Sequence, residues 1–174
     1  MIKNARCLFL SKMNEASPPT ANAQLLEKRY RTSVIAVSVQ ILIMLALTVV
    51  AWFVITYSNN DISEQAGVAL WGTILLIAAG SFLLRRMLFS WERLKNVALL
   101  KGIPALLDNL QANTILLGAL GEVVAIMGFL VAVLSGNKFE MLRAGAISLI
   151  VFLMNFPRKS IWQKILAGAE NVLK

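Results

Sequence analysis

The sequence contains no histidine and a single cysteine, Cys7. Because histidine and cysteine are common metal ligands and a disulfide needs two cysteines, we expect no metal site built from these residues and no disulfide within the chain. Catalytic signatures are missing as well: there is no phosphate-binding glycine loop, no His-Glu-x-x-His motif and no Gly-x-Ser-x-Gly motif. We therefore predict a protein that is not an enzyme and that needs no cofactor.

Charged residues are also scarce. They make up 15% of the chain, whereas hydrophobic residues make up 58%, and soluble domains usually have about 25% charged residues. The 17 Lys and Arg outnumber the nine Asp and Glu, which gives a formal net charge of +8. Since the basic residues fall at the ends of apolar runs, the expected partner is a bilayer with an anionic inner leaflet and not a nucleic acid.

Four apolar runs are long enough to be membrane spans: 34–57, 66–84, 114–134 and 141–156. A helix of about 20 apolar residues crosses the hydrocarbon core. The fourth run is the shortest, and Arg143 near its start can extend its side chain to the headgroups. The runs are continuously apolar and do not alternate, which favours helices over barrel strands. We predict an all-α polytopic membrane protein whose residues 34–156 form a four-helix transmembrane domain.

The basic residues are distributed unevenly between the two sides of these spans. Residues 1–33, 85–113 and 157–174 hold 15 of the 17 Lys and Arg, and only Lys138 and Arg143 fall on the other side. Cytoplasmic segments carry the excess of Lys and Arg, so both termini are predicted to be cytoplasmic. The expected location is a bacterial inner membrane, and the inner membrane of an organelle is the alternative.

The segments outside the spans are not alike. Residues 1–33 are expected to form a basic, flexible arm, and the cytoplasmic loop 85–113 to be partly helical with a local break at Gly102 and Pro104. Residues 157–174 place apolar and polar side chains on opposite arcs of a helical wheel, which predicts an amphipathic helix on the inner leaflet. Docking of this helix on a soluble partner is the alternative. The side chains expected at the membrane surface are Arg85, Arg86, Arg158, Lys159, Trp162 and Lys164.

Small residues recur along the third span at alternating intervals of four and three. They are Gly118, Gly121, Ala125, Gly128 and Ala132, extended by Thr114 and Ser135 at the two ends; we call the first five the small-residue seam. In lipid, small residues let helix backbones approach closely, which is a main route to helix association. The leading prediction is a non-enzymatic integral membrane protein that assembles through this seam, as a homo-oligomer or with other membrane subunits.

Glu122 is an acid near the middle of the third span, on the flank of the seam. A charge at the centre of a membrane helix costs roughly 2.5 to 3.5 kcal/mol on translocon scales, so such residues usually have a specific role. Two interpretations remain open. A protonated Glu122 can hydrogen-bond a neighbour such as Gln40, the other strongly polar residue deep within a span, or Glu122 can carry a proton or small cation, with Gln40 as a second candidate residue.

The residues from Glu122 onward, Glu-Val-Val-Ala-Ile-Met-Gly-Phe-Leu-Val-Ala-Val-Leu, resemble the ion-carrying helix of subunit c of rotary ATP synthases. In that family an acid is followed by a similar pattern of small and apolar residues. The resemblance implies that Glu122 is an ion-carrying carboxylate and that the protein is a proton or small-cation carrier or channel component. It covers about a dozen residues, and the run 66–84 lacks the dense glycine repeat of that family's first helix.

Overall fold

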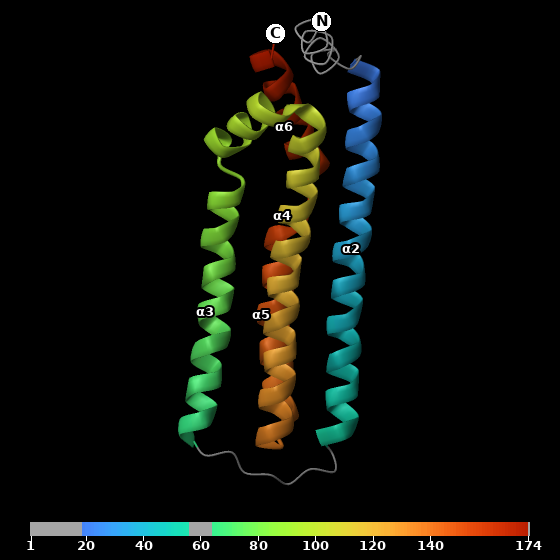
Figure 1. Cartoon of the computed structure of the whole chain (residues 1–174). Helices are drawn as coiled ribbons and strands as arrows, with labels where there is room; N and C mark the ends of the chain where they lie inside the picture. The colour runs from blue at the N-terminus through green and yellow to red at the C-terminus, as the bar shows by residue number, and fades with distance from the viewer. Residues whose placement is uncertain (1–18, 56–63, 174) are drawn as a thin grey trace, which may run out of the picture.

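The computed structural model describes residues 19–55 and 64–173, and every regular element in these ranges is a helix (Figure 1). The helices are α2 (Pro19–Val54), α3 (Glu64–Leu88), α4 (Trp91–Ser135), α5 (Lys138–Asn155) and α6 (Lys159–Leu173). Helix α4 contacts all four others. Helices α2 and α3 lie on opposite sides of the α4–α5 pair, and α6 lies at the end of the bundle where α2 begins (Figure 1). The predicted all-α fold is confirmed.

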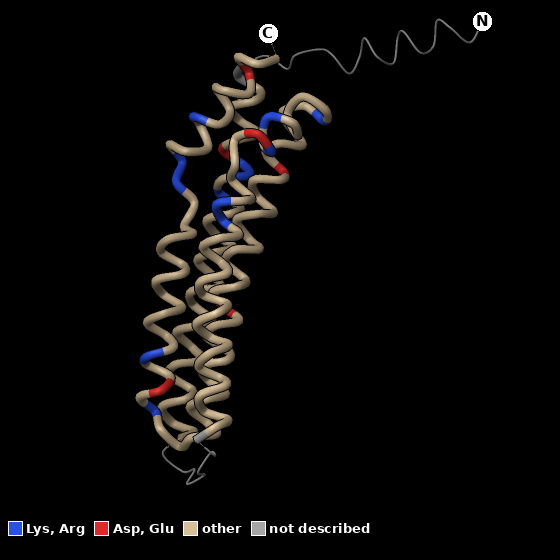
Figure 2. Tube along the Cα trace, turned by 90° about the vertical axis from the view of Figure 1, so that its left-hand side faces the viewer, with Lys and Arg blue, Asp and Glu red and all other residues tan. Residues whose placement is uncertain are grey.

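Within residues 19–55 and 64–173, four stretches are long and apolar enough to cross a membrane, as the sequence predicts. They are Ala21–Val54, Gln65–Leu88, Trp91–Ser135 and Lys138–Leu173. Charged residues gather at the two ends of the bundle, and the middle is almost free of them (Figure 2). The apolar side chains that point outward from α2 and α3 form a surface suited to lipid. Within each helix the backbone groups bond one another, so the middle of these helices needs no water.

The segment between the second and third predicted spans is almost entirely helical. Helix α3 continues to Leu88, and only Phe89 and Ser90 separate it from α4. Gly102 has φ 81° and ψ 176°, a conformation that favours glycine, and it interrupts α4 at the break that the sequence predicts. The first part of α4, residues 91–101, therefore runs across the end of the bundle (Figure 1).

Helix α2 begins before the first predicted span. Of the arm that was expected to be flexible, residues 1–18 lie outside the described residues, and residues 19–33 are helical. The physical reason is tertiary packing. Leu26 is buried in a cluster with side chains from α4 and α6, which we call the cap cluster. Its buried members are Leu26, Leu94, Ala98, Leu106, Leu107, Leu110, Trp162, Leu166 and Ala169.

Candidate functional site

The small-residue seam lies in the interior of the bundle, and all five of its residues are buried. The side chain of Gln40 from α2 lies directly against Gly118. On α5, the ring of Phe152 lies 3.2 Å from the position that a Cβ would take at Gly121. A Cβ at Gly128 would overlap the Cβ of Ala144, also on α5. The seam therefore packs α4 against α2 and α5 of the same chain.

The two alanines of the seam complete the packing on α2. Ala125 is buried with Val37 and Met44, and Ala132 is buried with Ala51. The three α2 residues follow one another at intervals of seven, or about two helical turns, so they share one face of α2. This face lies along the seam over most of the length of the predicted first span.

A hydrogen bond between helices adds to this packing, and the sequence reasoning missed it. The hydroxyl of Ser148 on α5 donates to the backbone carbonyl of Gly121 at 2.7 Å, and both groups are buried. Ala144 and Ser148 are small residues spaced four apart, so they share one face of α5. This spacing was the sequence signal for a close contact between α5 and the seam.

Gln40 packs against Gly118, and Glu122 follows Gly118 one helical turn later on the flank of the seam. The side-chain oxygen of Gln40 is buried and accepts no hydrogen bond from any described residue. Glu122 is half-buried four residues after Gly118, and no hydrogen bond or ion pair joins it to another residue in 19–55 or 64–173. Side chains on a helix lean towards its N-terminus, so the Glu122 carboxyl extends towards the level of Gly118, against which Gln40 packs.

The Gln40 oxygen can accept only from a group that carries a hydrogen. A protonated carboxyl group carries an O–H that can donate to an amide oxygen, whereas a carboxylate only accepts. The Gln40 oxygen is an unfilled acceptor one helical turn from Glu122. The oxygen can therefore accept a hydrogen bond from a donor placed at this level of α4.

The residues predicted at the membrane surface lie at the end of the bundle where α3 ends and α6 begins, but they have different roles. Arg86 and Lys164 are exposed, and Arg85 and Arg158 line one small pocket. Trp162 departs from the prediction, because it is only 1% exposed. Its ring lies in the cap cluster, edge-on to Tyr30 with a centroid distance of 6.0 Å, and is not at the surface.

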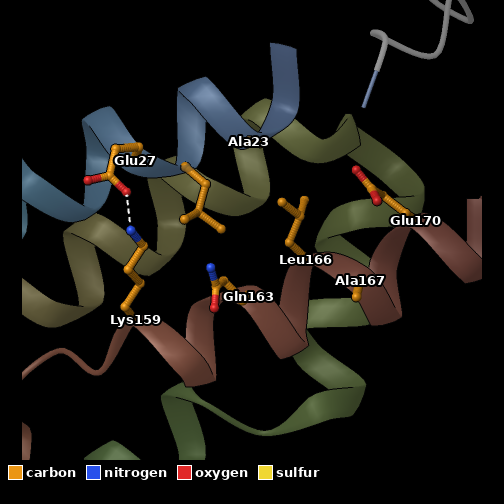
Figure 3. A pocket seen from close by; sticks show the side chains of 8 residues that line it. Ala23, Glu27, Lys159, Gln163, Leu166, Ala167 and Glu170 are labelled. Atoms are coloured by element: carbon orange, nitrogen blue, oxygen red, sulfur yellow. Dashed lines mark ion pairs between the residues drawn. The ribbon is translucent and has the colours of Figure 1, made fainter. Parts of the chain in front are cut away.

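Lys159 is held at a cleft between α2 and α6 (Figure 3). Its Nζ lies 2.6 Å from Oε2 of Glu27, and further along the cleft the amide of Asn22 donates to Glu170 at 3.0 Å. Hydrogen bonds from Lys159, first, and from Arg31 lower the pKa of Glu27 below its ordinary value. The cleft has a volume of about 430 Å³. The sequence could not indicate it, because the helix over residues 19–33 was not predicted.

At the opposite end of the bundle, one acid joins two helices. The indole N–H of Trp71 on α3 donates to Glu140 on α5 at 2.8 Å, and Arg143 pairs with the other oxygen of Glu140 at 3.0 Å. Because α3 otherwise contributes apolar side chains, such as Ile74 against Val124, this polar contact fixes its position along the bundle.

No three His, Cys, Asp or Glu side chains gather into a possible metal site within the part of the chain that the structure describes. The comparisons with known proteins add no assignment. No protein-family model, curated protein or solved structure matches this chain, so its function has to be inferred from the fold and from the side chains described above.

Proposed function

We propose that this protein is a non-enzymatic integral membrane protein that acts as a subunit of a larger membrane assembly, either with copies of itself or with other membrane proteins. Both termini lie in the cytoplasm. This orientation is supported by the basic residues, since only Lys138 and Arg143 lie at the end of the bundle away from α6. The same rule favours a bacterial inner membrane, with an organellar inner membrane as the alternative.

The amphipathic helix α6 lies at the cytoplasmic leaflet. It follows α5 after a three-residue connection, so it begins at the level where the fourth span ends. Its buried residues Trp162, Leu166 and Ala169 pack into the cap cluster, while Lys164 remains exposed and can meet anionic headgroups. The apolar arc of α6 thus stabilises the cytoplasmic end of the protein, and its basic residues contact lipid.

The observation that carries the assembly proposal is the half-buried Glu122, which pairs with no residue in the described ranges and lies beside an apolar face of α4. The sequence pattern predicted assembly through the seam, but the seam residues contact α2 and α5 of the same chain. A second polypeptide instead meets α4 on the face that carries the exposed Val123, Ile126 and Leu130, next to Glu122.

The energetics in lipid favour such a contact. An unpaired acid at mid-membrane is costly, and an interhelical hydrogen bond contributes about 0.6 kcal/mol on average and up to about 1.7. A partner helix with a polar group opposite Glu122 would supply that bond, and the neighbouring apolar residues would pack around it. Glu122 therefore acts as the polar centre of the interface.

The test is the oligomeric state of the purified protein in nanodiscs or mild detergent, for wild type, Glu122→Leu and the control Val68→Leu at an exposed position on α3. We expect wild type and the control to form a complex larger than one chain and Glu122→Leu to dissociate to single chains. A wild-type protein that stays monomeric, and captures no membrane subunit from its source membrane, contradicts the proposal. So does a Glu122→Leu variant that assembles as well as wild type.

A second candidate function is proton or small-cation transport through Glu122, as its resemblance to subunit c suggests. It is favoured by the Gln40 oxygen, which has no donor among the described residues and lies one turn from Glu122. In this function a protonated Glu122 donates to Gln40, and release of the proton breaks the bond. Glu122→Gln should then abolish ion flux in liposomes without loss of folding, and equal flux from both proteins would rule the function out. Carbodiimide labelling of Glu122 across pH, in wild type and in Gln40→Leu, shows whether the pair exchanges a proton.

A further inference from the structure

A small pocket with two arginines lies at the cytoplasmic end of the bundle, where α3 ends and α5 joins α6. Arg85 comes from the end of α3, and Arg158 comes from the connection between α5 and α6. The pocket has a volume of about 100 Å³ and its apolar lining includes Phe89 and Ile161. It is smaller than the 300 to 1,000 Å³ that is typical of drug-sized ligands, so it suits a single compact chemical group.

The two arginines have no acidic partner within the described residues. The ion pairs there involve Arg29, Arg31, Arg143 and Lys159, and neither Arg85 nor Arg158 takes part in one. Burial, and then the positive charge of Arg158, lower the pKa of Arg85 from its ordinary value. Bringing the two cations together is therefore unfavourable in the protein alone, and an anion between them would relieve the repulsion.

A third polar group in the pocket also lacks a partner. Asn155, the last residue of α5, lines the pocket and is only 8% exposed, and its side-chain oxygen accepts no hydrogen bond from any described residue. The oxygen is the enclosed end of this amide, so the NH₂ group at its other end is the one that can donate into the pocket. Two guanidinium groups and one amide donor then converge on the same small space.

We propose that this pocket binds the phosphate group of an anionic phospholipid from the cytoplasmic leaflet. Arginine forks match the oxygens of a phosphate and bind them in pairs, and basic pockets between membrane helices on the cytoplasmic side suit such headgroups. Phe89 and Ile161 supply apolar surface beside the anion site, where the glycerol and the start of the acyl chains would lie. The inference rests on the proposed membrane orientation, which puts this end of the bundle at headgroup level.

The test is a titration of the detergent-solubilised, full-length protein with phosphatidylglycerol or phosphatidylcholine, with bound lipids counted by native mass spectrometry. Wild type should hold one phosphatidylglycerol in preference to phosphatidylcholine. The double change Arg85→Gln with Arg158→Gln should weaken that binding about 30-fold, which corresponds to about 2 kcal/mol for two basic side chains. The control, Arg93→Gln with Lys95→Gln, removes the same charge from exposed positions on α4 and should bind nearly as wild type does.

Equal binding of the two lipids by wild type, or equal losses in the two double variants, would overturn the proposal. Displacement of phosphatidylglycerol by an equal concentration of inorganic phosphate would assign the site to a soluble anion and reject the lipid. If the Arg85 change prevents folding, Arg158→Gln alone decides the question, because Arg158 is exposed and its loss should weaken binding about fivefold. Insertion of wild type into phosphatidylcholine nanodiscs is measured separately, so a failure of the membrane proposal is distinguished from a failure of the lipid site.

Discussion

Replacing Gly128 with alanine should destabilise the bundle, although the same change elsewhere in a helix usually stabilises it. The added methyl group would overlap the Cβ of Ala144 on α5, and the sulfur of Met141 lies 3.8 Å from the same point. Neither α4 nor α5 can move away freely, because α4 is also packed against α2 and α3. The clash involves a Cβ and cannot be removed by rotation of a flexible side chain.

The size of the effect follows from a comparison with Gly72→Ala on α3. A Cβ at Gly72 would meet nothing within 4 Å, so this control reports only the helix preference of alanine, a gain of about 0.5 to 1 kcal/mol. Gly128→Ala gains the same helix preference, but the clash of its new methyl group with Ala144 lowers the free energy of unfolding by about 1 to 3 kcal/mol. The helix term cancels between the two variants, and Gly128→Ala should be less stable than Gly72→Ala by about 1 to 3 kcal/mol. Gly121→Ala should fall between them, since the Phe152 ring lies at 3.2 Å and needs to shift only slightly.

The assay is reversible unfolding in mixed micelles with a rising fraction of sodium dodecyl sulfate, followed by circular dichroism. Adding Ala144→Gly to Gly128→Ala should restore much of the lost stability, because it removes the atom that the new methyl group meets. Contacting residues in such double-mutant cycles show coupling energies of about 0.5 to 3 kcal/mol. If Gly128→Ala unfolds at the same point as Gly72→Ala, or if Ala144→Gly gives no rescue, the described contact between α4 and α5 is wrong.

Two further predictions concern polar contacts. The pKa of Glu27 is lowered mainly by Lys159, so their ion pair stabilises the contact of α2 with α6 at pH values above the ordinary glutamate pKa. This stabilisation is lost as the pH falls through the lowered pKa. Hydrogen exchange of α6, corrected for the intrinsic effect of pH, should therefore rise in that pH range in wild type and change much less in Lys159→Gln. Ser148→Ala should remove the bond to Gly121 and cost about 0.6 to 1.7 kcal/mol in the micelle assay, whereas the exposed Ser38→Ala should change stability little. An unchanged midpoint for Ser148→Ala would show that the bond does not contribute to stability.

The spans could be predicted from the sequence because lipid imposes a local rule on each segment. A run such as 114–134 is apolar and long enough by itself, whatever the other helices do. The seam likewise predicted close packing of the third span. The seam could not predict which helix packs against it. Glycines such as Gly118 and Gly128 allow close approach equally to a helix of the same chain and to a helix of another chain. That choice depends on Gln40 and Ala144, which lie on other helices and do not enter the pattern of the third span.

The end of the protein that α6 covers was harder to predict because its stability comes from distant contacts. Residues 19–33 carry several charges and no long apolar run, so their own pattern did not indicate a helix that packs on the protein. Their helix is supported by Leu26 in the cap cluster and by Arg29, which pairs with Asp108 of α4 at 2.8 Å. The local pattern around Trp162 therefore predicts an aromatic side chain at the surface. In the structure Trp162 is buried in the cap cluster, which forms only when α2, α4 and α6 pack together.

Glu122 and the arginine pocket lie at different levels along α4, so the proposed assembly and lipid binding can act independently. Thr114 is the residue of α4 that lines the pocket, and Glu122 follows eight residues later, about 12 Å further along the helix. Arg85 and Arg158 come from α3 and from the α5–α6 connection, and they lie at the end of the bundle where α6 begins, whereas Glu122 lies near the middle of the predicted third span. A partner helix at Glu122 therefore leaves the arginine pocket open to lipid, and a phospholipid bound there leaves the Glu122 face of α4 free.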